Sequence, residues 1–144
     1  MRVLLDTNIL LDYLVDREPY STFAEQIMEA CVNQKISGCI SAHSIPDMFY
    51  ILRKNFSQEE RREWLLALCQ VLDVIGLERD TLIEALENKE FTDFEDCIQS
   101  LNAMRGQADV IITRNIKDFE CSLISCISPD EFVKNFLIGR SETE

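Results

Sequence analysis

MRVLLDTNILLDYL, residues 1–14, carries one apolar run up to a single carboxylate and resumes with a second apolar run soon after it. Residues 3–5 are short and apolar, as in a buried strand, and the strand ends at Asp6. Residues 9–11 are apolar again and predict a helix that packs back on this strand. The stretch therefore favours an α/β fold in which Asp6 stands at a strand–helix joint.

The rest of the chain repeats this alternation of short apolar runs with longer helical patterns. The predicted strands are residues 3–5, 39–40, 71–75, 110–112 and 123–127. Helices are predicted at residues 20–33 and 45–54, and after capping boxes at residues 57–60, 92–95 and 128–131. This order predicts a three-layer α/β/α sandwich with a central, mostly parallel five-stranded sheet.

Length and composition indicate one globular domain, residues 1–144. The chain has 144 residues, of which 47% are hydrophobic and 28% charged. No apolar run approaches the roughly 18 residues of a membrane span, and early charges argue against a signal peptide, so we expect a cytoplasmic protein. Six cysteines without a C-x-x-C pair, and a single histidine, favour free thiols over a zinc site.

The net charge of −12 argues against a protein that coats nucleic acid, because affinity for phosphates comes from lysine and arginine. Net charge describes solubility and non-specific association and leaves the chemistry of a site open. Acidic side chains gathered in one place are also potential metal ligands. A metal-dependent enzyme acting on nucleic acid, or a basic partner, stays compatible with this charge.

Several carboxylates fall where the predicted fold forms a crevice, beyond the carboxyl ends of the strands. Asp6 follows the first strand and Asp118 lies in the segment after the fourth. Asp47 starts one helix, and Asp93 and Asp96 share a face of another, from which Glu95 is expected to turn away. Carboxylates brought together repel one another unless a cation joins them, and oxygen ligands suit Mg²⁺ or Mn²⁺. Such a site can activate a water for phosphodiester hydrolysis.

Each of these residues also has an ordinary structural interpretation. Asp6 is placed to cap a helix, and Asp47 and Asp93 fall in first turns, where a carboxylate complements the helix dipole. Asp118 can be a surface loop residue. His43 has no second histidine or cysteine nearby in the sequence, so a structural role is favoured over a catalytic one. The joint placement of the carboxylates, together with the resemblance described next, favours a site.

The chain resembles the PIN-domain family, and within it the VapC-type toxins of bacterial toxin–antitoxin pairs. The matching stretches are LLDTNILLDYL with DREP, ISAHSIPDMFYILRK, DFEDCIQ, ADVIITRNIKDF and ISPDEF, which follow one another along nearly the whole chain. The resemblance implies a parallel sheet and a Mg²⁺-dependent (or Mn²⁺-dependent) endoribonuclease with three or four acidic residues. It also implies an RNA substrate, a cognate antitoxin and a homodimer.

The resemblance assigns roles position by position. The implied catalytic acids are Asp6, Asp47, Asp96 and Asp118. Three of these, Asp6, Asp96 and Asp118, are the implied metal ligands, while Asp47 stands where the family commonly has glutamate. Asn115 follows the strand more closely than Asp118, but Asp118 alone brings a charge and is preferred. The implied supporting residues are Thr7, Asn8, Asp93, Thr113 and Asn115.

RNA-binding residues are assigned less directly. Four basic side chains near the expected crevice could meet phosphates, and an ordinary solvated role suits each equally well: Arg53, Lys54, Arg114 and Lys117. Phe49, Tyr50 and Phe56 are more typical of core or dimer contacts than of base stacking.

Two other classes of function compete with a ribonuclease. A PIN-like binding or scaffold module without catalysis would suit the acidic charge and the sparse basic residues. A phosphotransfer domain is disfavoured, because Asn8 stands where an aspartyl phosphatase would need a second aspartate and no glycine-rich phosphate loop is present.

Overall fold

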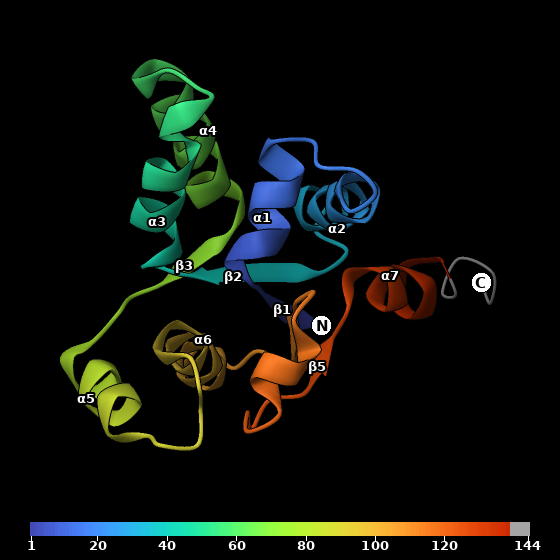
Figure 1. The fold of residues 1–144 in the computed structure, drawn as a ribbon. Helices are drawn as coiled ribbons and strands as arrows, with labels where there is room; N and C mark the ends of the chain where they lie inside the picture. Colours follow the sequence, from blue (N-terminus) through green and yellow to red (C-terminus); the bar gives the residue numbers. More distant parts are fainter. Residues whose placement is uncertain (139–144) are drawn as a thin grey trace.

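A five-stranded parallel sheet forms the centre of the computed structural model, which describes residues 1–138 (Figure 1). The order across the sheet is β3-β2-β1-β4-β5, with every neighbouring pair parallel. The strands are β1 (Arg2–Leu5), β2 (Ser37–Ser41), β3 (Asp73–Ile75), β4 (Val110–Ile112) and β5 (Cys126–Ile127). The central strand is therefore the first one in the sequence, and its Leu4 lies in register with Cys39 and Ile111.

Helices cover both faces of this sheet, as Figure 1 shows. One face is covered by α1 (Thr7–Leu14), α2 (Ser21–Val32), α3 (Ser44–Ile51), α4 (Gln58–Val71) and α7 (Pro129–Phe132). The other face is covered by α6 (Phe94–Arg105), the 3₁₀ helix η2 (Ile116–Phe119), and α5 (Arg79–Glu87), which packs on α6. The predicted three-layer sandwich is confirmed.

Alternation along β1 explains how one strand serves two cores. Val3 and Leu5 are buried with the helices of the first face, while Leu4 is buried with Ile111 and Ala103 on the second face. Because successive side chains of a strand point to opposite faces, a strand covered on both sides must be apolar throughout. This is why residues 3–5 carry no polar side chain before Asp6.

Several predicted boundaries move in the structure. The capping box at Ser57 is present, but α6 is capped by Asp93 rather than Thr92, and the Ser128 side chain makes no capping bond. Residues 71–72 are not in a strand, since α4 ends at Val71, and β5 keeps only two residues of the predicted 123–127. The predicted helix 45–54 is α3 followed by the 3₁₀ helix η1 (Leu52–Lys54).

The end of α7 continues into η3 (Val133–Ile138), a π-helical segment. Among residues 1–138, no helix combines the length and the apolar content that crossing a bilayer requires.

The sheet order has a topological switch point at β1. After β1 the chain adds β2 and β3 on one side of this strand, and later β4 and β5 on the other side. Ligands of open α/β sheets bind at such a point, outside the carboxyl ends of the strands. Asp6 is the first residue after β1, and its backbone N–H donates to Ile112 O at 3.1 Å. The fold therefore places Asp6 at the carboxyl end of β1, at the switch point, as the sequence predicts.

Candidate active site

Asp6 is a buried carboxylate held by donors from several elements. Its Oδ1 accepts from Thr7 N at 2.7 Å, which caps α1, and its Oδ2 accepts from Thr113 Oγ1 at 2.7 Å and Asn8 Nδ2 at 3.2 Å. Burial raises the pKa of Asp6 above its ordinary value, while the bonds from Thr113 and Thr7 lower it and the charge of Glu95 adds to the increase. Asp6 is thus both a helix cap and a fixed carboxylate, so its structural and functional interpretations coexist.

Gln99 joins this carboxylate to two neighbouring helices. Its side chain is fully buried on α6, one turn after Asp96, and its Nε2 lies 3.2 Å from Thr7 Oγ1 and 3.3 Å from Ser44 Oγ. The same Nε2 lies 3.5 Å from Asp6 Oδ1, and the hydroxyls of Thr7 and Ser44 are 2.8 Å apart. The sequence analysis missed Gln99 and Ser44. A glutamine among the apolar residues of a helix that carries a candidate ligand was the available signal.

Asp96 lies half-buried on the first turn of α6 and has the most perturbed carboxyl group of the site. Burial, followed by the charges of Asp93, Asp6, Asp118 and Glu95, raises the pKa of Asp96 to about 7. The backbone N–H of Asp96 donates to Asp93 Oδ1 at 3.0 Å, so Asp93 is the cap of this helix. Asp96 therefore interacts electrostatically with carboxylates from α6, from the β1–α1 joint and from η2.

The raised pKa of Asp96 predicts how stability depends on pH. Between the unfolded value of 3.8 and about 7, the folded protein retains a proton that the unfolded chain has released, so this group lowers the free energy of unfolding as pH rises. Asp96→Asn removes this loss. In EDTA, the variant should gain on the order of 1 kcal/mol relative to wild type between about pH 5 and about pH 8, a figure reduced for solvent screening.

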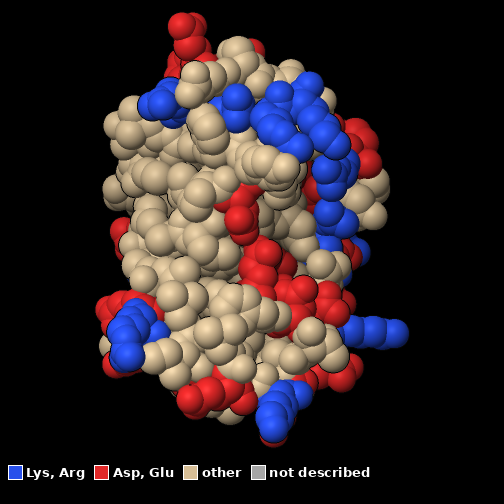
Figure 2. Space-filling model, turned by 60° about the vertical axis from the view of Figure 1, so that its left-hand side comes forward, with Lys and Arg blue, Asp and Glu red and all other residues tan. Residues whose placement is uncertain are grey.

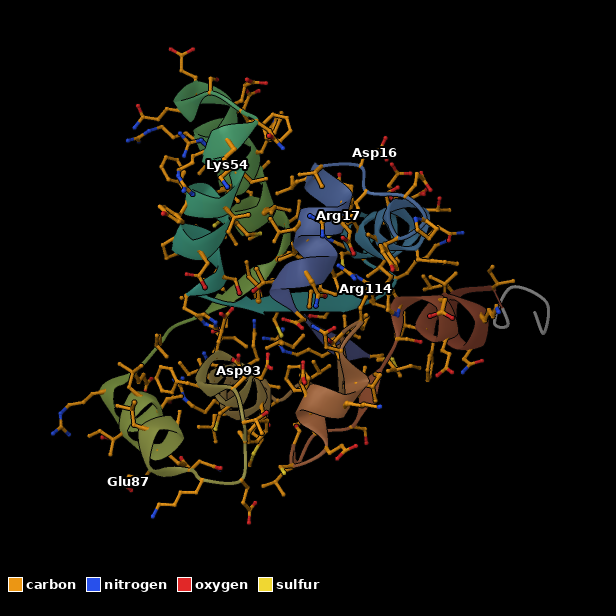
Figure 3. The ribbon with its side chains drawn as sticks, viewed as in Figure 1. Asp16, Arg17, Lys54, Glu87, Asp93 and Arg114 are labelled. Carbon is orange, nitrogen blue, oxygen red and sulfur yellow. The ribbon has the colours of Figure 1, made fainter. Side chains whose placement is uncertain are left out.

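Thermal unfolding at the two pH values measures this difference. Glu87→Gln is the matched control, since it removes one exposed carboxylate from α5, where Glu87 points to solvent (Figure 3). Its difference from wild type should be the same at both pH values. An equal, pH-independent difference for Asp96→Asn would contradict the prediction.

The segment after β4 offers two candidates for the fourth position, and the structure distinguishes their surroundings. Asp118 lies on η2, and its charge contributes to the raised pKa of Asp96. The backbone N–H of Asn115 donates to Thr113 Oγ1 at 3.0 Å, which fixes the hydroxyl that binds Asp6. This arrangement favours Asp118 as the acid and Asn115 as a support through its backbone.

Asp47 lies close to His43 and Glu95, neither of which the sequence analysis assigned to the site. One ligand atom each from His43, Asp47 and Glu95 lie within 4.8 Å of one another, and no other three or more His, Cys, Asp or Glu side chains of residues 1–138 do so. Glu95, which was predicted to turn away from the face of Asp93 and Asp96, faces α3, where its Oε1 lies 3.5 Å from His43 Nε2. Burial and the Glu95 charge raise the pKa of Asp47, whereas the contact with His43 lowers the pKa of Glu95.

The three predicted metal ligands are therefore neighbours of this group without being part of it. Asp6, Asp96 and Asp118 interact electrostatically, yet their oxygens are not gathered as tightly as the ligand atoms of His43, Asp47 and Glu95. The atoms around Asp6 that could bind a metal ion are carboxylate, amide and hydroxyl oxygens, which suit Mg²⁺ and Mn²⁺. Asn8 Oδ1 and Gln99 Oε1 are buried oxygens without a hydrogen-bond partner among the described residues. The residues present fit a divalent cation.

Basic side chains surround this acidic region unevenly. Figure 2 shows acidic side chains running through the middle of one face, with many of its lysines and arginines along the upper and right-hand edges. Arg53 lies over the Tyr50 ring at 3.5 Å, and Lys54 is exposed at the outer end of η1, away from the sheet (Figure 3). Lys117 is exposed on η2, beside Asp118. These three remain available to a polyanion.

Arg114 differs from the other basic candidates because internal contacts occupy its guanidinium group. Its Nε donates to Asp12 Oδ2 at 2.7 Å and its Nη2 to Asp12 Oδ1 at 3.2 Å, while the guanidinium carbon lies 4.1 Å from the centre of the Tyr20 ring. Asp12 is 1% exposed. This arrangement favours a structural role for Arg114 over the RNA contact proposed from the sequence.

Comparison with known proteins places the chain in a family. Residues 2–117 match the PIN domain, so the chain belongs to the PIN-domain family, as the sequence motifs predicted. No curated protein matches the chain. Similar solved structures include a chain of the toxin–antitoxin complex from Klebsiella pneumoniae, with 24% identity, a TM-score of 0.64, and coverage of 88% of this chain and 97% of that one.

Two further structures share this fold. One is VapBC2 from Rickettsia felis bound to a DNA fragment from its promoter, at 18% identity and a TM-score of 0.63, covering 89% of this chain and 98% of that chain. The other is VapBC-1 from nontypeable Haemophilus influenzae, at 19% identity and a TM-score of 0.63, covering 90% and 99%. Likeness at these identities establishes the fold.

Proposed function

We propose that this chain is a divalent-metal-dependent endoribonuclease and the toxin of a toxin–antitoxin pair. The observation that supports the proposal best is the electrostatic interaction of Asp96 with Asp6 and Asp118, which adds to burial in raising the pKa of Asp96, in a chain that belongs to the PIN-domain family. Such a concentration of negative charge is costly for the protein alone and is offset by a bound cation.

Asp6, Asp96 and Asp118 would hold Mg²⁺ or Mn²⁺, with Asp47 at the margin of the site. The ion, when bound, would lower the pKa of a water and offset the charge that develops on a phosphodiester. The chain itself supplies the positioning: Thr7, Thr113 and Gln99 hold the Asp6 carboxylate, and Asp93 caps the helix that carries Asp96.

The toxin role rests on the similar structures, which are of toxin–antitoxin complexes. The acidic site of this chain would be complementary to an arginine or lysine from a cognate antitoxin. An ion pair between that side chain and the site carboxylates would guide association of the two proteins. We further propose that residues 1–144 form a single domain. Two copies of the chain would form a homodimer, located in the cytoplasm. A small reading frame directly upstream of the gene is the simplest observation that would support the partner.

The test is cleavage of RNA by the purified chain with Mg²⁺, with Mn²⁺ and with EDTA. We expect cleavage of RNA only with a divalent ion, no cleavage of a DNA strand of the same sequence, and an unchanged rate for Glu87→Gln. Absence of RNA cleavage with either ion, in a folded protein, would overturn the nuclease proposal and favour a binding or scaffold module.

A further inference from the structure

A pocket of about 400 Å³ lies between the start of α2, the start of α7 and the side chain of Arg114. Figure 3 shows Arg114 where α1, α2 and α7 approach one another. The residue before it, Thr113, donates to Asp6, so the pocket and the Asp6 carboxylate share the segment that follows β4. The volume is in the range of pockets that bind small molecules, roughly 300–1,000 Å³.

Two aromatic side chains line this pocket. Tyr20 directly precedes α2 and Phe23 follows it by three residues, so both rings lie on the same side of this segment. Phe23 packs against the core, whereas Tyr20 is 38% exposed. The guanidinium group of Arg114, which is paired with Asp12, lies 4.1 Å from the centre of the Tyr20 ring and supports it. Aromatic rings of this kind stack with nucleobases, because every base has a π face.

The polar part of the lining comes from α7 and η3. Hydrogen bonding from Ser128, followed by backbone N–H groups and the charge of Lys134, lowers the pKa of Asp130, so this carboxyl group is ionised near neutral pH. A carboxylate can accept two N–H groups at once, and among the four RNA bases only guanine presents two neighbouring donors on its Watson–Crick edge. Lys134 is exposed on η3 and can contact a phosphate.

We propose that this pocket binds the guanine base of an RNA nucleotide that flanks the cleaved bond. Tyr20 and Phe23 would stack with the base. Asp130 would accept from its two donors, and Lys134 would contact the phosphate. The inference rests on the proposed ribonuclease function, to which it adds a sequence preference, but binding of the base itself requires neither a metal ion nor cleavage.

Titration of the full chain with each of the four ribonucleoside 5′-monophosphates in EDTA, followed by NMR, tests this pocket. Guanosine monophosphate (GMP) should bind at least about tenfold more tightly than the other three, and Asp130→Asn should remove this preference. Tyr20→Leu should weaken GMP binding at least about tenfold through the lost stacking. Tyr50→Leu is the matched control, because Tyr50 is also exposed beside an arginine, Arg53 at 3.5 Å, but lies on α3 outside the pocket.

Lys134→Gln is a second variant should Tyr20→Leu not fold, because Lys134 is exposed. The wild-type chain should bind GMP more tightly than guanosine, which lacks the phosphate, and Lys134→Gln should remove that difference. No saturable binding of GMP, equal binding of all four nucleotides, or wild-type affinity in folded Tyr20→Leu would contradict the proposal even if the chain cleaves RNA. A pocket that receives a protein segment would give the first of these results. The expected preference for GMP in a chain that cleaves no RNA would contradict only the nuclease proposal.

Discussion

Asp6→Asn is expected to lower the rate of divalent-metal-dependent RNA cleavage by about 100-fold or more while the protein stays folded. A bound ion contributes several kcal/mol to stabilising charge in the transition state, and each 1.4 kcal/mol, roughly, is a factor of ten in rate. An amide in place of the carboxylate removes the charge that would hold the ion at the centre of the site. The change keeps the size and shape of the side chain.

The fold should tolerate this substitution for reasons visible around Asp6. Asparagine caps helices as well as aspartate does, so α1 keeps its start. Burial raises the pKa of Asp6, which shows that the folded protein does not favour the charge. Circular dichroism and thermal unfolding report folding, and a cleavage assay with Mg²⁺ reports the rate. Cleavage by folded Asp6→Asn at the wild-type rate would show that Asp6 has no part in catalysis.

The sequence predicts the architecture well because the strands of this sheet are covered on both faces. Residues 3–5 and 110–112 are apolar throughout, as the central strands β1 and β4 must be, and turn-forming neighbours bound them. The edge strands are harder to predict. β5 has two residues, and its end is determined by pairing with β4 rather than by its own composition.

The site shows a similar division between local and non-local information. The positions of Asp6, Asp96 and Asp118 in the site can be predicted from the ends of strands and the starts of helices in the sequence. The electrostatic interaction of Asp96 with the other two is consistent with that placement. The contact between His43 and Glu95 depends on how α3 and α6 approach each other across the end of the sheet. Helical spacing within residues 92–99 predicts that Glu95 and Asp96 point in different directions. It does not predict which of these directions faces another helix.

Gln99 illustrates the same point for supporting residues. Its amide reaches Thr7 and Ser44, which come from two other helices, so no spacing in the sequence links the three. Most buried polar groups have a hydrogen-bond partner, and that partner can come from any part of the chain. The sequence indicates that Gln99 is unusual in its helix, and the fold explains why.

Arg114→Met should lower the free energy of unfolding by about 2–3 kcal/mol. The substitution leaves the buried carboxylate of Asp12 with Arg17 as its one remaining cationic partner. Arg114 makes two close contacts with Asp12, at 2.7 and 3.2 Å, and the remaining cation, Arg17, lies 3.5 Å away and is half exposed. Methionine keeps an unbranched apolar stem and removes the guanidinium group, together with its two bonds to Asp12 and its contact with the Tyr20 ring. Removing one partner of a buried pair costs more than the pair contributes.

Unfolding in urea measures this loss, and a double-mutant cycle with Asp12→Asn isolates the pair. The two losses should be far from additive, since each variant removes the same contacts. Arg53→Met is the matched control, because Arg53 lies over an exposed tyrosine, and its loss should change stability by less than about 0.5 kcal/mol. An RNA-binding Arg114 would behave in the opposite way, with unchanged stability, a higher KM and a weaker salt dependence.

The Asp12–Arg114 pair also bears on the site, because Arg114 lies between Thr113, which donates to Asp6, and the segment that leads to Asp118. Anchoring Arg114 to α1 therefore helps to hold the start of the 113–118 segment relative to Asp6. Arg114→Met should weaken Mn²⁺ binding in the same preparation that loses stability, whereas Arg53→Met should leave it unchanged. Wild-type stability and Mn²⁺ affinity in Arg114→Met would return this residue to the group of exposed cations that can meet RNA.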